Sequence, residues 1–179
     1  FNDGKDLSEF EGFTLDNYVS VFRDSHLLGL LANSVILAVC AAVIATVLGT
    51  LAALGIQAMR GRIRRLVMSL TNIPLVNPEI VSGISLALLF VLVGRVMLSK
   101  EDILGFATLL IAHVTFCLPY VILSVMPKLR QLDPSLMDAA QDLGCTPAQG
   151  FFKVVLPELL PGIISGAIMA FTMSLDDFV

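Results

Sequence analysis

The stretch 27–56, LLGLLANSVILAVCAAVIATVLGTLAALGI, carries no charged side chain and decides the fold class of the chain. A helix that crosses the roughly 30 Å hydrocarbon core of a bilayer needs about 20 mostly apolar residues, and this stretch is longer than that. The chain of 179 residues is 56% hydrophobic and 15% charged, whereas about a quarter of the residues in soluble domains are charged. The sequence therefore predicts an integral membrane protein.

Three more apolar stretches follow along the chain, and they cover about 66–94, 103–127 and 159–179. Glu79 is the only charged residue of the first of these, and the last runs into Asp176 and Asp177. Lipid offers no partner to unpaired backbone groups, so spans of this length form helices. We predict an all-α, polytopic transmembrane helical bundle. The chain begins without Met and ends inside an apolar run, so we also expect this bundle to be truncated at both ends.

A basic loop between the first two predicted spans sets the orientation in the membrane. It holds Arg60, Arg62, Arg64 and Arg65, and the positive-inside rule assigns such a loop to the cytoplasm. Alternation then makes residues 1–26 an extracytoplasmic loop, ahead of a transmembrane domain at 27–179, and places residues 128–158 inside. The segments assigned to the inside carry seven basic residues against four outside. The acidic loop 1–26 fits a solvated segment, or one that receives a cationic solute or docks a protein.

Residues 128–158 predict two short helices joined by a sharp turn. In the first helix, Asp133 is a suitable cap, Pro134 suits the first turn and Gly144 can take the left-handed terminating conformation. Its expected apolar face comprises Leu136, Ala140 and Leu143.

Separate start and stop signals predict the second helix of this segment. Thr146 and Gln149 have the spacing of a capping box, and Pro147 falls at the first helical position. Pro157 is expected to end this helix ahead of the last span, because proline lacks a backbone N–H and clashes with the preceding turn.

The same segment carries a spaced motif. In order, it comprises Asp138-Ala139-Ala140, three residues, Gly144, nine residues, Val154, one residue and Leu156-Pro157. This spacing resembles the EAA loop of binding-protein-dependent ABC importer permeases, with Asp138 in place of Glu and Val154 in place of Ile. The resemblance covers essentially the whole chain. It implies the fold of a type I ABC importer permease in the bacterial inner membrane.

In that family the loop is the coupling element that seats in the cytoplasmic ABC ATPase dimer, and the resemblance implies the same role here. Gly144 would be the turn, Asp138 would offer a carboxylate, and Ala139 with Ala140 would permit close approach. The resemblance also implies a second permease subunit and an extracytoplasmic substrate-binding protein. The chain contains no Gly-rich phosphate loop, so we expect no catalytic residues and place ATP and Mg²⁺ on the partner ATPase. A helical loop with no docking role is the alternative.

Three further stretches narrow the resemblance to the spermidine/putrescine permeases. They are Asn77-Pro78-Glu79-Ile80-Val81 with Ile84-Ser85-Leu86, then HVTFCLP at 113–119 and FTMSLDD at 171–177. Polyamines are flexible polycations, so their path should offer carboxylates at intervals. Glu79, Asp176 and Asp177 are the candidates, because ionisable residues inside a membrane point to a pathway. Glu79 also suits the start of a helix capped by Asn77, and the two roles are compatible.

The residues leave some other functions open and disfavour the rest. Another solute, such as ferric iron, an opine or a phosphonate, would use the same machinery, and a gated channel is a further alternative. The motifs of intramembrane or hydrolytic enzymes are missing from the chain. The net charge of −4 gives no sign of a nucleic-acid partner. The cysteines and histidines lack metal-binding spacing, so we expect no metal site.

Small residues recur every four positions in the first and last spans. They are Ala41, Ala45, Gly49 and Ala53 in the first, and Gly162, Gly166 and Ala170 in the last. Such residues let membrane helices approach closely, so we predict packing stripes, with lining of a solute path as the alternative. We expect His113 to pack or to form a hydrogen bond within its span.

Overall fold

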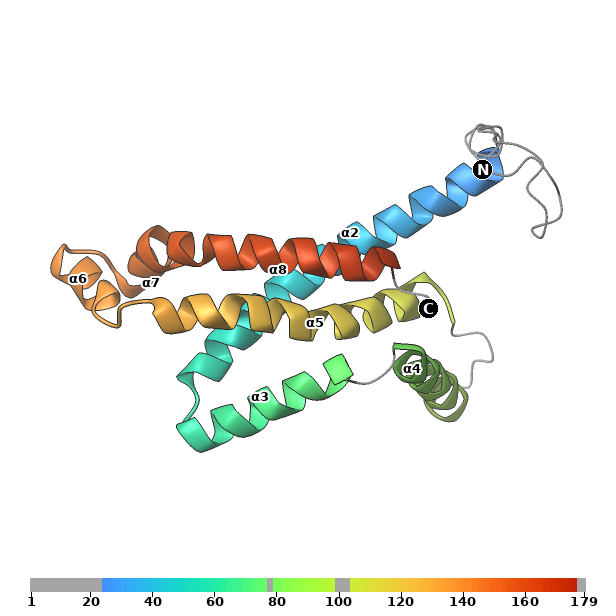
Figure 1. Ribbon diagram of the computed structural model, residues 1–179, viewed down its shortest axis with the longest axis horizontal. Helices are drawn as coiled ribbons and strands as arrows, with labels where there is room; N and C mark the ends of the chain where they lie inside the picture. The colour runs from blue at the N-terminus through green and yellow to red at the C-terminus, as the bar shows by residue number, and fades with distance from the viewer. Residues whose placement is uncertain (1–23, 77–78, 99–103, 177–179) are drawn as a thin grey trace, which may run out of the picture. The chain divides into compact units, whose positions relative to one another are not determined.

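The computed structural model describes residues 24–76, 79–98 and 104–176. Within these ranges the chain is helical apart from its turns, which confirms the predicted all-α class (Figure 1). The helices are α2 (Ser25–Ala58), α3 (Gly61–Val76), α4 (Glu79–Val93), α5 (Phe106–Gln131), α6 (Leu136–Asp142), α7 (Pro147–Gly150) and α8 (Leu156–Asp176). Two π-helical turns, η1 (Gly94–Leu98) and η2 (Phe151–Val155), follow α4 and precede α8.

Among the described residues, three helical segments are long and apolar enough to cross a membrane, namely Ser25–Ala58, Phe106–Gln131 and Pro147–Asp176. The predicted span 66–94 comprises two helices, in line with the helix start expected next to Glu79: α3 ends at Val76 and α4 begins at Glu79. Residues 77 and 78, where the sequence places the cap and the first helical proline, lie outside the described residues, as do residues 1–23 of the acidic loop.

The chain divides between Ile36 and Leu37 into two units. Of the first unit the structure describes the beginning of α2, where the Asp24 carboxylate accepts a hydrogen bond from the His26 backbone N–H at 2.9 Å. This bond satisfies one of the donors that a helix start leaves unpaired. The apolar side chains that the structure describes in this unit are exposed, Leu27, Leu28, Leu30 and Leu31 among them.

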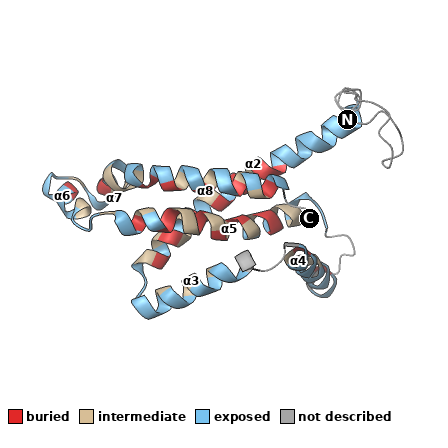
Figure 2. Ribbon diagram, viewed as in Figure 1, coloured by how far each residue is buried: buried red, intermediate tan, exposed pale blue. Residues whose placement is uncertain are grey.

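In the second unit, α5 and α8 lie side by side along most of their length (Figure 1). Their buried residues face each other, as Figure 2 shows in red. Glycine makes this approach possible. A Cβ on Gly162 would lie 3.1 Å from the Ser124 carbonyl oxygen, and one on Gly166 would lie 3.2 Å from Val121 Cα.

The C-terminal part of α2 packs against the same pair of helices. Its small residues at four-residue intervals are all buried, and a Cβ on Gly49 would lie only 2.7 Å from Val121 Cβ. Alanines of α2 belong to one apolar core together with Val121 and Val125 of α5 and Leu159 of α8. The packing interpretation of both small-residue stripes is therefore confirmed.

The prediction that Pro157 ends the second loop helix is wrong. The chain is helical without a break from Pro147 to Asp176, and Pro157 lies in the first turn of α8. The turn just before it is π-helical, and the Leu156 N–H donates to the carbonyl of Phe151, five residues back. This wider turn accommodates the missing donor and the ring of the proline, which an unaltered α-helical ladder would not.

We predict that Gly49→Ala destabilises the protein by about 1–3 kcal/mol, the usual range for overpacking a close contact. Gly55→Ala is the matched control on the same helix, because a Cβ there would meet nothing within 4 Å. That change should be neutral or stabilising, by up to about 1 kcal/mol. Thermal or denaturant unfolding of the purified protein in detergent measures both. Adding Val121→Ala to Gly49→Ala should restore part of the loss, and equal effects of the two glycine changes would contradict the contact.

Candidate functional site

The segment that carries the spaced motif begins where α5 ends at Gln131. The Asp133 carboxylate accepts hydrogen bonds from the Ser135 backbone N–H at 2.9 Å and from the Ser135 hydroxyl at 2.7 Å. These bonds stabilise the ionised form and hold the pKa of Asp133 below its usual value. Helix α6 begins at Leu136, so Pro134 lies in the turn before the helix and not in its first turn as predicted.

The turn after α6 depends on one glycine. Gly144 has φ +84°, in the left-handed region predicted for it. Its N–H donates to the Gln141 carbonyl at 2.8 Å, and the Cys145 N–H donates to the Ala140 carbonyl at 3.1 Å. This pair of bonds is a Schellman motif, which satisfies the carbonyls that the end of a helix leaves unpaired.

The start of α7 is fixed by the predicted capping box. The Gln149 N–H donates to the Thr146 hydroxyl at 3.3 Å, and the Thr146 N–H donates to the Gln149 side-chain oxygen at 3.1 Å. Pro147 occupies the first helical position, where no N–H is needed. The two helices are thus held on both sides of Gly144 by local hydrogen bonds.

The inner face of α6 differs from the expected one. Ala140 and Gly150 are buried, and a Cβ on Gly150 would lie 2.9 Å from the Met137 sulfur. Met137 and Ala140 therefore form the contact with α7. Leu143 was expected on that face, but it is 87% exposed. The reason is that α6 ends at Asp142, so Leu143 already belongs to the turn and leaves the helical periodicity.

The motif residues consequently divide between two environments. Asp138 and Ala139 are exposed on α6, whereas Ala140 packs inward. Val154 and Leu156 are half-buried at the junction with α8, and Pro157 is exposed. The outer surface of α6 and its turn thus presents Asp138, Ala139 and Leu143 to solvent. We call these three residues the outer face of the loop.

Two of the candidate solute residues, Glu79 and Asp176, lie at helix ends. Asp176 is the last residue of α8 and is exposed. Glu79 is the first residue of α4, but its side chain and the whole of Asp177 lie outside the described residues. Whether the three carboxylates line one path stays a prediction.

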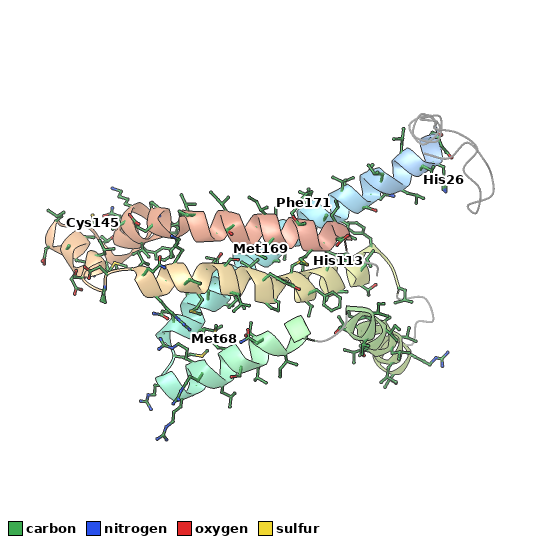
Figure 3. The ribbon with its side chains drawn as sticks, in the orientation of Figure 1. His26, Met68, His113, Cys145, Met169 and Phe171 are labelled. Atoms are coloured by element: carbon green, nitrogen blue, oxygen red, sulfur yellow. The ribbon has the colours of Figure 1, made fainter. Side chains whose placement is uncertain are left out.

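A buried hydrogen bond anchors the end of α8 that carries Asp176. His113 Nδ1 lies 2.9 Å from the Ser174 hydroxyl oxygen, and His113 is 2% exposed (Figure 3). One turn further along, the Cys117 sulfur donates to the Ala170 carbonyl at 3.2 Å. Sequence reasoning expected a hydrogen bond from His113 but missed Ser174. A serine in an apolar run, two residues before a carboxylate, was the available signal.

These features define a polytopic helical membrane subunit with an exposed two-helix loop between two membrane-spanning segments. The chain belongs to the family described as "Binding-protein-dependent transport system inner membrane component", which matches residues 27–179. The resemblance noted from the spaced motif is thereby confirmed, and so is the inner-membrane location.

Characterised relatives match the chain over its full length. It is 40% identical over 181 residues to the putrescine transport system permease protein PotI of Escherichia coli K12. It is 37% identical over 179 residues to the spermidine/putrescine transport system permease protein PotC of Haemophilus influenzae, and 34% identical to PotC of E. coli K12. The chain covers 100% of its own length in all three alignments, but only 64%, 67% and 65% of the respective relatives.

We predict that Gly144→Val weakens the loop by about 1–2 kcal/mol, because a β-branched side chain is disfavoured in the left-handed region. Gly144→Asn should cost less, since Asn tolerates that conformation. Hydrogen exchange of the Gly144 and Cys145 amides would report the change. Gly105→Val is a control, because Gly105 has extended backbone and open space around it. Equal protection of these amides in the Val and Asn variants would contradict the role of the turn.

Proposed function

We propose that the chain is a permease subunit of an ATP-driven importer and docks a cytoplasmic ABC ATPase through the outer face of the loop. The observation that carries this proposal is the rigid, exposed geometry of α6 and its turn. A Schellman motif and a capping box fix the loop locally, while Asp138, Ala139 and Leu143 are left to solvent. A small residue, a carboxylate and a protruding apolar side chain suit a groove on a partner protein.

The connection from the loop into the membrane supports a coupling role. From Pro147 to Asp176 the chain is continuously helical, so a displacement of α7 is transmitted directly to α8. The loop's other end joins α5, which packs against α8. A push on the loop would therefore move α5 and α8 together.

Other chains would supply the remaining parts of the transporter. ATP and Mg²⁺ would be bound by the ATPase dimer, and this subunit would perform no catalysis itself. A second permease subunit would complete the path, and a substrate-binding protein would deliver the solute from outside. The role of a substrate-binding protein accords with the family description of a binding-protein-dependent transport system.

We infer that the solute is a polyamine, spermidine or putrescine. The relatives at 34–40% identity are named for these solutes. The chemistry is compatible, since Glu79 at the start of α4 and Asp176 at the end of α8, with Asp177 next in the sequence, supply more than one negative charge. Separated carboxylates suit a flexible polycation, which can exchange one contact for the next as it moves.

Ala139→Arg tests the docking role. A long charged side chain at this exposed position should prevent close approach of the ATPase, so we expect ATP-driven uptake and ATPase co-purification to fall at least tenfold. The measurement uses the complete transporter reconstituted in proteoliposomes. Ala107→Arg is the matched control, because Ala107 is also exposed and lies in the first turn of α5, on the predicted outer side. Normal assembly and uptake in Ala139→Arg would contradict the proposal, and uptake without any ATPase would favour a channel.

Glu79→Gln, Asp176→Asn and Asp177→Asn test the polyamine path. Each should lower uptake of labelled spermidine at least tenfold, because a contact to a cation is lost, while ATPase binding stays intact. Glu158→Gln is the control, since Glu158 is an exposed acid at the opposite end of α8. Unchanged uptake in all three variants would reject the assignment. If ferric iron, an opine or a phosphonate competed in this uptake assay and putrescine did not, the competing compound would be assigned as the solute instead of a polyamine.

A further inference from the structure

A concentrated basic surface lies at the turn between α2 and α3. A concave surface of about 610 Å³ is lined by Arg60, Gly61, Arg62, Ile63, Arg64 and Arg65. No Asp or Glu occurs in the sequence from Ser25 to Pro78. None of the four guanidinium groups forms an ion pair with a carboxylate of the described residues. The positive charge of this turn is therefore not neutralised within the part of the chain that the structure describes.

The arginines differ in what they do for the fold. Arg64 is half-buried and its Nη1 donates to the Gln57 side-chain oxygen at 3.2 Å, which ties α3 to the end of α2. Arg60, Arg62 and Arg65 are exposed. The Arg65 Nε donates to the Gly61 carbonyl at 3.4 Å, and this bond does not use the two Nη groups of the exposed side chain. Three guanidinium groups thus remain to bind a ligand without loss of the turn.

The start of α3 adds to this positive charge. The first hydrogen bond into the helix runs from the Arg64 N–H to the Arg60 carbonyl. The N–H groups of Gly61, Arg62 and Ile63 precede it and lack partners within the helix, and they carry the positive end of the helix dipole. Backbone donors and guanidinium groups therefore meet at one place, an arrangement that suits an oxyanion.

An apolar strip runs from this cluster along α3. Ile63, Leu66, Leu70 and Ile73 are 53%, 62%, 55% and 52% exposed, respectively. Their spacing of three, four and three residues places them on one face of the helix. The ligand surface is therefore amphipathic, with a cationic end at the turn and an apolar strip leading away from it.

We propose that this surface binds an anionic phospholipid, with the headgroup phosphate on Arg60, Arg62 and Arg65 and an acyl chain along the apolar strip of α3. The positive charge of the cluster favours an anionic ligand. The adjoining apolar strip favours an anion that carries a hydrocarbon chain, and not free phosphate. Basic clusters at membrane boundaries bind anionic lipid headgroups in this way. The bound lipid would hold the turn at the predicted cytoplasmic surface, whichever solute the transporter carries.

The test uses the purified protein in non-ionic detergent, titrated with dioleoylphosphatidylglycerol and followed by native mass spectrometry. Changing Arg60, Arg62 and Arg65 together to Gln should weaken lipid binding on the order of 100-fold, because each basic side chain near anionic lipid contributes about fivefold. Arg64 is kept, since it bonds to Gln57. The matched control changes three exposed basic residues elsewhere to Gln, namely Arg95, Arg130 and Lys153, and should bind the lipid normally.

Two further arms identify the ligand. Leu66→Asn should weaken binding of phosphatidylglycerol, and millimolar inorganic phosphate should not compete with the lipid. Equal binding of the lipid by the triple arginine variant would overturn the proposal. If inorganic phosphate displaced the lipid, the site would be a simple anion site, and the proposal would be overturned as well. Loss of ATPase co-purification with unchanged lipid binding would assign the cluster to a protein contact instead.

Discussion

Val121 is the residue on which three helices of this protein converge. The backbone of α2 approaches it at Gly49, and the backbone of α8 approaches it at Gly166. Both contacts are so close that a side chain at either glycine would displace its neighbour. In lipid there is no hydrophobic drive between helices, so association depends on van der Waals contact and a few hydrogen bonds. Small residues at four-residue intervals supply that contact over the length of a helix.

Helices α5 and α8 contact each other at several positions along their length. Near one end, His113 bonds to Ser174 and Cys117 bonds to the carbonyl of Ala170. In the middle, Gly166 lies against Val121, and toward the loop Gly162 lies against Ser124 and Lys128. Polar and steric contacts therefore alternate along one interface. Such an interface favours rigid movement of the pair over bending of either helix.

Much of this arrangement was predictable because it is local. The charge-free run 27–56 implied a membrane helix, and the cap at Thr146 and the left-handed turn at Gly144 follow from the residues next to them. The misses have three different causes. Pro157 continues a helix because a π-helical turn precedes it, and Leu143 is exposed because the helix ends one residue earlier. Ser174 could be singled out as a serine in an apolar run, but its partner His113 lies 61 positions away and could not be found from the local sequence.

The sequence predicted where the candidate site lies but not which way its residues face. Spacing located the motif from Asp138 to Pro157, but only the packing of α6 on α7 separates the inward Ala140 from the outward Asp138 and Ala139. This separation explains how two neighbouring alanines can serve different purposes. A Cβ on Gly150 would lie 3.4 Å from Ala140 Cβ, so Ala140 faces a close neighbour, whereas Ala139 is exposed. A small side chain on this exposed face suits the close approach of the partner that we propose for it.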